Sequence, residues 1–308
     1  MLYYIHQTII KKIYGLLNDL EEAALIRNQQ FSKNIDFLPT NRINDIANSN
    51  LVIICAGLFA NQEEKTKYTL TDLSGRHIQA YKNFPIINNL CEQINLHTPN
   101  TSVIIITNQV DIMSEIARKK LHSAKVYGLG CYLDTIRFKK IFSTLTHLKQ
   151  SEFDAVLLGF HNQNLFIQDA SFQISSHLTN IETYKKLALQ KTINRGKEIS
   201  DMQKDIHHPN INSGSSKLPA AALFNIIAAF TQTNTKKIII PLNRRLDKEN
   251  ISTAAQALCQ ISYNSITHKY TELSANNLSE LKKGIEIIHK NIKFIQQLHT
   301  QSNNRGKE

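Results

Sequence analysis

The sequence predicts an α/β fold, with a parallel sheet in the first part of the chain and an α+β arrangement in the second. The apolar runs Leu51–Gly57 and Val103–Thr107 are typical of buried parallel strands. A stretch with helical spacing, Asp72–Leu96, separates them, and this alternation indicates strands joined by crossover helices. The alternation stops after these elements, so we predict two units, residues 1–125 and residues 126–300.

The first unit contains further elements around these strands. Met1–Ile5 is predicted as a strand, and Thr8–Asn28 as a helix because isoleucine and leucine recur there at helical spacing. We expect another strand within Phe31–Asn50, a polar loop over Leu58–Thr71 and a helix over Ile112–Leu121. Together these elements form a sheet covered by helices.

The second unit is predicted to mix short strands with long helices. Its elements, in order, are a Gly-rich turn and helix over Val126–Leu148, a strand over Asp154–His161, a hairpin or pair of short strands over Leu165–His177, a helix over Ile181–Asp205, an Ala-rich helix from Lys217, a strand over Lys236–Pro241, further antiparallel strands to His268, and a closing helix over Leu278–Leu298. The polar residues 301–308 are expected to form a disordered tail.

Composition excludes several classes of protein. The net charge is +11, but the lysines are scattered, so we expect a phosphate-bearing ligand or a protein as partner rather than nucleic acid. None of the four cysteines forms a C-x-x-C pair, which favours a reducing cytoplasm. No signal peptide or membrane-length apolar run is present. The adjacent His207 and His208 precede Pro209 and indicate a loop, so we expect no metal site.

Three motifs carry the chemistry. TNQVDI (Thr107–Ile112) ends a predicted strand, GLGCYLDTIRF (Gly128–Phe138) spans the Gly-rich turn and helix, and GFHNQ (Gly159–Gln163) ends a later strand. Asp134 and Arg137 are three residues apart and share one helix face, which on its own usually means a solvated ion pair. Each motif alone is weak, but all three in this order and near this spacing are a more specific signal.

These motifs resemble the lactate/malate dehydrogenase family, whose corresponding strings are TNPVDI, G-x-G-T-x-L-D-S-A-R-F and G-E-H-G-D. The resemblance extends from about Leu2 to Ile295. It implies a truncated Rossmann-type parallel sheet domain followed by an α+β substrate domain. It also implies a cytoplasmic oxidoreductase that transfers a hydride between NAD and a small 2-hydroxy or 2-oxo acid, and a homo-oligomer.

The resemblance also assigns roles to residues. His161 exchanges a proton with the substrate, and Asp134 orients its imidazole. Arg137 binds the substrate carboxylate by a two-point fork, and Asn108 hydrogen-bonds the reacting oxygen. Two further residues complete the list: Ser216 would line the substrate pocket, and Gly57 together with Asn108 would lie against the cofactor.

The sequence departs from the family pattern at the cofactor and at the mobile lid. No G-x-G-x-x-G turn occurs, and His6 or Gln7 stands where the family has a ribose-binding Asp. Leu70 occupies the position of the lid Arg, which Lys65 or Lys67 could replace only as a point charge. Two hypotheses stay open: an impaired dehydrogenase, or a non-catalytic pseudoenzyme or assembly subunit.

The family pattern begins about one strand and one helix before Met1, so a start upstream of Met1 is a third possibility. Gln109 replaces the family's Pro in the first motif, and Phe160, Asn162 and Gln163 replace the residues around its histidine. We therefore expect the backbone at both places to differ from the family's.

Overall fold

The structure is a computed structural model that describes residue 40 and residues 42–58, 75–122, 125–161, 163–206, 217–231, 237–246, 251–269 and 272–305. The strand and helix predicted at the beginning of the chain, the predicted strand before Leu51, and the polar loop beyond Leu58 lie outside the described residues. Ser216, predicted to line the substrate pocket, lies outside them too.

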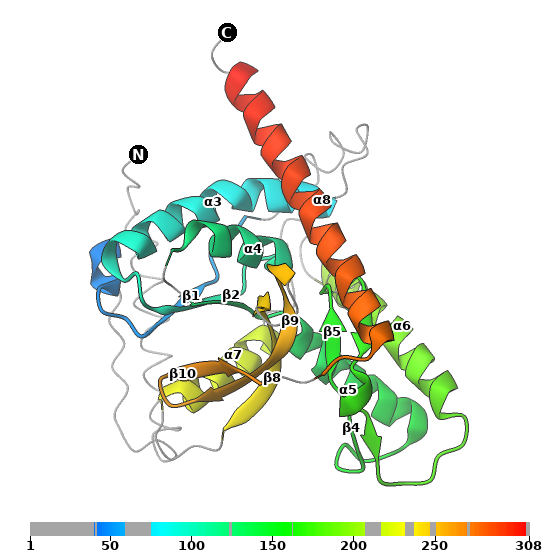
Figure 1. The fold of residues 1–308 in the computed structure, drawn as a ribbon. Helices are drawn as coiled ribbons and strands as arrows, with labels where there is room; N and C mark the ends of the chain where they lie inside the picture. The colour runs from blue at the N-terminus through cyan, green and yellow to red at the C-terminus, as the bar shows by residue number, and fades with distance from the viewer. Residues whose placement is uncertain are drawn as a thin grey trace.

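A six-stranded sheet forms the centre of the molecule, in the order β1-β2-β3-β8-β9-β10 (Figure 1). Its strands are β1 (Leu51–Ile54), β2 (Ser102–Ile105), β3 (Lys125–Gly128), β8 (Ile238–Leu246), β9 (Ile251–Ser262) and β10 (Ser265–His268). The first three are parallel, as predicted, and the last three are antiparallel. One residue pair, Gly128 with Asn243, joins the two groups. The sheet thus continues across the predicted boundary at residue 125, and the division into two units stays a prediction.

Strand β1 is less buried than we predicted. Ile54 is buried, but Leu51, Val52 and Ile53 are only half-buried. Among the described strands, β1 pairs with β2 alone, so one of its edges has no neighbour within this part of the chain. The prediction of a fully buried strand was therefore wrong for its first three residues.

Helices cover both faces of the sheet (Figure 1). On one face lie α3 (Gly75–His97), α4 (Val110–Lys120) and α8 (Ala275–Arg305), and on the other lies α7 (Lys217–Thr231). In β2, Val103 and Ile105 join the core cluster under α3 and α4, whereas Ile104 joins the cluster under α7. Alternate side chains of a strand point to opposite faces, so a strand buried on both faces reads as a continuous apolar run.

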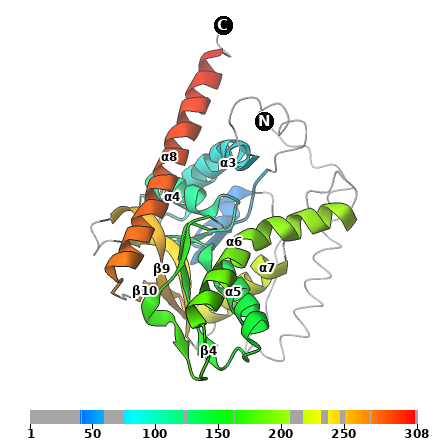
Figure 2. The same ribbon diagram turned by 90° about the vertical axis from the view of Figure 1, so that its right-hand side faces the viewer.

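A second layer lies beside the sheet and carries the Gly-rich turn. It consists of α5 (Cys131–Thr146), α6 (Ile181–Ile206), the strand pairs β4 (Phe153–Asp154) with β7 (Gln173–Ile174) and β5 (Leu157–Gly159) with β6 (Leu165–Ile167), and the short 3₁₀ helix η2 (Asp169–Ser171). Packed phenylalanines, Phe138, Phe142 and Phe153, form its core. Figure 2 shows α5 and α6 lying side by side. The predicted strand before His161 is split into β4 and β5, whereas the predicted pair of short strands after it is confirmed.

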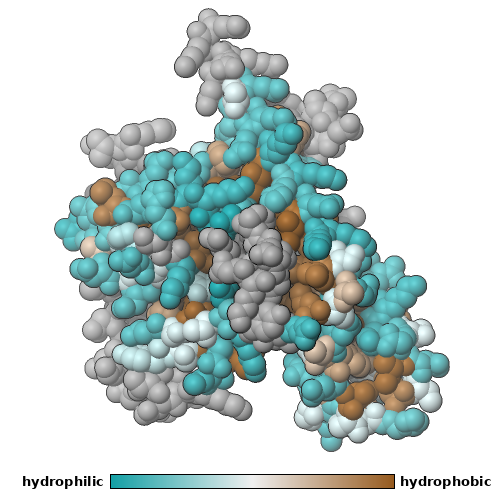
Figure 3. Space-filling view, viewed as in Figure 1, coloured by the Kyte–Doolittle hydropathy of each residue, from teal (hydrophilic) through white to brown (hydrophobic). Residues whose placement is uncertain are grey.

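The closing helix is longer than we predicted. Helix α8 continues to Arg305, so residues 301–305 are helical and the prediction of a disordered tail was wrong for them. Its buried side, with Ile288, Ile292 and Ile295, packs into the core under α3, and hydrophilic residues cover much of its visible outer surface (Figure 3). Another 3₁₀ helix, η1 (Ile43–Ile46), precedes β1. Among the helices that the structure describes, none combines the length and apolar character that crossing a bilayer requires.

Candidate active site

The candidate site lies at the Gly-rich turn between β3 and α5. The backbone of this turn is closely approached by side chains from other elements. A Cβ added to Gly128 would lie 2.3 Å from Ser114 Oγ, and one added to Gly130 would lie 2.8 Å from Gln256 Nε2 and 3.4 Å from His161 Cβ. Glycine is therefore required at both positions for contact rather than for an unusual backbone angle.

His161 is held by Asp134. The Nδ1 atom of His161 lies 2.6 Å from Asp134 Oδ2, and the Asp134 side chain is fully buried in the first turn of α5. The positive end of the helix favours a carboxylate there. The contact with Asp134 holds the imidazole in a fixed orientation. The His161 side chain is 17% exposed, so part of it faces the surface.

Arg137 completes this group from the next turn of α5. Its Nη1 lies 3.2 Å from Asp134 Oδ1, and its side chain is 10% exposed. The ion pair predicted from the helix spacing therefore forms, but it is buried rather than solvated. Asp134 therefore bridges His161 and Arg137, because Oδ2 contacts the imidazole and Oδ1 contacts the guanidinium.

A second buried carboxylate, Asp111, holds the backbone of His161. Asp111 Oδ2 accepts the His161 N–H at 2.8 Å, and Oδ1 accepts amide hydrogens of Asn243 at 2.8 Å and Gln256 at 2.6 Å. Burial raises the pKa of the Asp111 carboxyl group, and the positive charge and hydrogen bonds of its neighbours oppose this shift. One signal in the sequence could have pointed to this residue, because Asp111 is a lone acid between the apolar Val110 and Ile112.

The backbone of the turn before His161 is held by one glycine and one hydrogen bond. Gly159 has a φ of +116°, and Phe160, which is 2% exposed, donates its N–H to the carbonyl oxygen of Asn164 at 2.9 Å. This hydrogen bond closes the β5–β6 hairpin directly before His161. The buried Phe160 thus anchors the hairpin and fixes where His161 begins.

Asn108 lies at the carboxyl end of β2, and its side chain is exposed. Val110, two residues later, approaches the same point at Gly130 as His161 does, at 3.2 Å from an added Cβ. Gln109 adopts a φ of 52°, which proline cannot reach, so the family's Pro could not occupy this backbone. Asn108 lies in this turn, and its carbonyl oxygen accepts a hydrogen bond from Asn83 at 3.4 Å.

The ends of β1 and β2 form the described edge where a dinucleotide would lie, because ligands of parallel sheets bind at the carboxyl ends of the strands. Residues 55–58 are exposed there. Asn83 accepts the Leu58 N–H at 2.6 Å, and Thr107 donates to the carbonyl oxygen of Ala56 at 2.7 Å. A Cβ on Gly57 would lie 3.0 Å from Thr107 Cγ2, so packing alone accounts for that glycine. These hydrogen bonds hold the exposed segment in place.

Comparisons with known proteins identify the family that this chain is similar to. The family model described as "lactate/malate dehydrogenase, NAD binding domain" matches residues 2–128. A malate dehydrogenase from Caldivirga maquilingensis is 30% identical over 205 residues, which are 64% of this chain and 62% of that protein. Another, from Chlorobium chlorochromatii, is 27% identical over 274 residues, which are 84% of this chain and 80% of that protein.

Solved structures share the fold. Malate dehydrogenase from Plasmodium falciparum superposes with a TM-score of 0.74 at 19% identity, covering 92% of this chain and 87% of that one. A structure of that enzyme in complex with NADH gives a TM-score of 0.72, also at 19% identity and with the same coverage. Both solved structures therefore have the same arrangement of sheet and helices as this chain.

Proposed function

Since the chain belongs to the lactate/malate dehydrogenase family, we propose that it transfers a hydride between NAD(H) and a small 2-hydroxy or 2-oxo acid. The observation that carries this proposal is the buried group of His161, Asp134 and Arg137, in which one carboxylate bridges an imidazole and a guanidinium. This group contains a proton donor, its orienting partner and a cation for a carboxylate. Reduction of a 2-oxo acid uses a group of each of these three kinds.

Each residue has a proposed task. Asp134 engages Nδ1 of His161, so the proton passes between the substrate oxygen and Nε2. Arg137 binds the substrate carboxylate, because a guanidinium matches a carboxylate at two points. Asn108 hydrogen-bonds the reacting oxygen from the end of β2. Ser216, from its position in the sequence, lines the pocket.

NAD(H) is the proposed cofactor, and Gly57 and Asn108 are the proposed residues against it. When bound, its nicotinamide ring supplies or accepts the hydride. The exposed end of β1 supports this assignment, because it leaves room next to the turn that carries Asn108. Family relatives solved with NADH support the choice of cofactor.

We further propose that turnover is impaired. No G-x-G-x-x-G turn occurs in the sequence, and Leu70 stands at the position of the lid Arg. Losing one charge-assisted hydrogen bond to the substrate carbonyl removes about 1.5–3 kcal/mol, which slows chemistry about ten- to a hundred-fold or more. The same two departures favour the alternative that the protein is a non-catalytic relative or an assembly subunit.

Oxidation of NADH at 340 nm with oxaloacetate or pyruvate tests the proposal. We expect slow but measurable turnover that His161→Asn lowers by about 10²–10⁴-fold, the usual contribution of a positioned proton donor. The matched control is His177→Asn, since His177 is exposed in the same layer, and this variant should retain full activity.

Equal turnover in the His161→Asn variant would contradict the proposed proton donor. Absence of turnover in a folded wild-type protein would favour the non-catalytic alternative. The two outcomes are distinguishable because one concerns a variant and the other the parent chain.

A further inference from the structure

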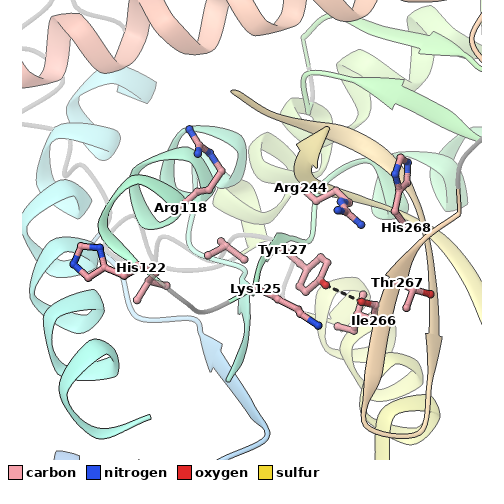
Figure 4. A pocket seen from close by; sticks show the side chains of 10 residues that line it. Arg118, His122, Lys125, Tyr127, Arg244, Ile266, Thr267 and His268 are labelled. Atoms are coloured by element: carbon pink, nitrogen blue, oxygen red, sulfur yellow. Dashed lines mark hydrogen bonds between the residues drawn. The ribbon is translucent and has the colours of Figure 1, made fainter. Parts of the chain in front are cut away.

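A cleft lies away from the candidate active site, where β3 and β8 separate. These strands share one residue pair, Gly128 with Asn243. Toward the amino end of β3 lies a cleft of about 550 Å³ (Figure 4). Its walls come from four elements: the carboxyl end of α4, β3, β8 and β10. Lys125, at the amino end of β3, lines it, whereas the Gly-rich turn and Asp134 follow the carboxyl end of the strand. The two sites therefore lie at opposite ends of β3.

The cleft is lined by basic residues. Arg118, Lys125 and Arg244 line it together with His122 and His268, and none of the lining residues is acidic. Lys125 is exposed and makes no ion pair within the described residues. Arg118 is paired with the buried Glu115 at 2.6 Å, but Glu115 also pairs with Lys119 at 3.4 Å. One carboxylate is thus shared by two cations of α4.

Arg244 lines the cleft from β8. Figure 4 shows its guanidinium between the Tyr127 ring and His268. Burial raises the pKa of Tyr127 to about 12 and that of Cys259 to about 12, and the charge of Arg244 opposes both shifts. Both groups are uncharged at neutral pH, and the Cys259 side chain hydrogen-bonds Arg244. Tyr127 donates to the carbonyl oxygen of Ile266 at 2.8 Å, which fixes its ring as part of the floor.

The rest of the lining is apolar. Leu121, Val126 and Ile266 contribute aliphatic surface beside the Tyr127 ring. A volume of about 550 Å³ lies within the range of small-molecule sites, about 300–1,000 Å³, and far exceeds what a bare phosphate ion fills. The cations line this hollow from separate elements, whereas nucleic acid is bound by cations that follow a groove or face. This favours a compact ligand with a strongly charged group and an apolar body.

We propose that this cleft binds a small phosphate monoester. The phosphate lies between Lys125 and Arg244, because a guanidinium forms two hydrogen bonds to phosphate oxygens and an ammonium contributes a point charge. The organic part lies against Tyr127, Val126 and Ile266. The binding requires neither NAD(H) nor the proton chemistry of His161, so it is independent of the proposed dehydrogenase function.

Calorimetric titration of the full chain with phenyl phosphate and with inorganic phosphate tests the proposal. We expect one phenyl phosphate per chain, bound about tenfold or more tightly than inorganic phosphate because only the ester uses the apolar wall. Lys125→Gln and Arg244→Gln should each weaken phenyl phosphate about tenfold or more, the effect of losing one charge-assisted hydrogen bond.

The matched control is Lys282→Gln, which removes one exposed positive charge from α8, outside the cleft lining. It should change the affinity less than about twofold. Lys125 is exposed, so its variant should fold even if the half-buried Arg244 cannot be replaced.

Three results would overturn the proposal. One is the absence of saturable heat with either anion in the millimolar range. Another is an equal loss of affinity in the Lys282→Gln and Lys125→Gln variants, because general attraction to a basic surface would then explain the binding. The last is a single-stranded RNA oligomer that binds more tightly than phenyl phosphate and depends on Lys125, which would assign the cleft to nucleic acid. Turnover enters none of these measurements, so failure here leaves the dehydrogenase proposal untouched.

Discussion

Two buried carboxylates hold His161, and each acts on a different part of the residue. Asp134 fixes the ring, and Asp111 fixes the backbone N–H. Burying a charged carboxylate costs free energy unless donors surround it, and both have such partners. The motif resemblance led us to Asp134, Arg137 and His161. It did not lead to Asp111, because its donors Asn243 and Gln256 are 132 and 145 residues away in the sequence.

Asp111→Asn should change how the free energy of unfolding depends on pH. Burial raises the folded-state pKa of Asp111 above its unfolded value of about 3.9, so between these two values the folded protein binds more protons than the unfolded chain. The contribution of Asp111 to the free energy of unfolding therefore falls as pH rises from about 4 to the folded pKa. Asparagine does not titrate, so the variant lacks this slope.

Urea unfolding of both proteins between about pH 4 and 7 measures the effect. The free energy of unfolding of the wild type minus that of Asp111→Asn should decrease with increasing pH. A difference that increases with pH would mean that the three donors outweigh burial and that the pKa of Asp111 is lowered.

At the scale of elements, the β5–β6 hairpin positions the site. It is short, and its first strand ends at Gly159, so that Phe160 and His161 begin the connection to β6. The sequence predicted short strands here, but it could not show that β5 pairs with β6 while β4 pairs with β7. That pairing depends on packing against α5 and α6, through side chains such as Phe142 and Ala188. The extension of α8 was missed for a related reason, because the polar residues 301–305 carry no apolar period.

Gly159→Ala should destabilise the protein by about 1–3 kcal/mol. The φ of +116° is unfavourable for alanine, and the added Cβ would lie 1.9 Å from the carbonyl oxygen of Asn164. Gly284→Ala is the matched control in α8, where an added Cβ meets its nearest atom, Phe160 Cβ, at an ordinary 3.5 Å. There alanine should stabilise the protein by about 0.4–1 kcal/mol.

Chemical denaturation of both glycine variants gives the two values directly. Similar changes in the free energy of unfolding at the two positions would show that the Gly159 turn does not have the strained backbone described above. The contrast between the variants also controls for the general effect of a glycine-to-alanine change.

At the scale of the whole molecule, burial divides the cysteines into two groups. Cys55, next to the candidate cofactor edge, is exposed, whereas Cys91, Cys131 and Cys259 are buried. Burial raises the pKa of Cys91 and Cys259 to about 12 and raises that of Cys131 as well. The absence of a C-x-x-C pair favoured unpaired thiols, but it did not show that Cys55 is exposed. Cys55 lies just beyond the end of β1, where the strand leaves the core.

Iodoacetamide at about pH 8 should therefore modify one cysteine per folded chain, and peptide mapping should identify Cys55. Only the thiolate reacts, and a thiol with a pKa near 12 is almost entirely protonated at this pH. In urea all four cysteines should react. Rapid labelling of Cys91 in the folded protein would contradict the packing of α3 on the sheet. Rapid labelling of Cys259 would contradict the position of β9 within the sheet.

Titration of the purified chain with NADH, followed by NADH fluorescence with and without oxamate, tests the proposed dehydrogenase function most directly. Oxamate mimics a 2-oxo acid and occupies Arg137 and His161 in our proposal. We predict micromolar NADH binding that oxamate tightens, because the two ligands would meet at the end of β2 beside Asn108. No binding at millimolar NADH, with or without oxamate, would contradict a role for NAD(H) in this protein.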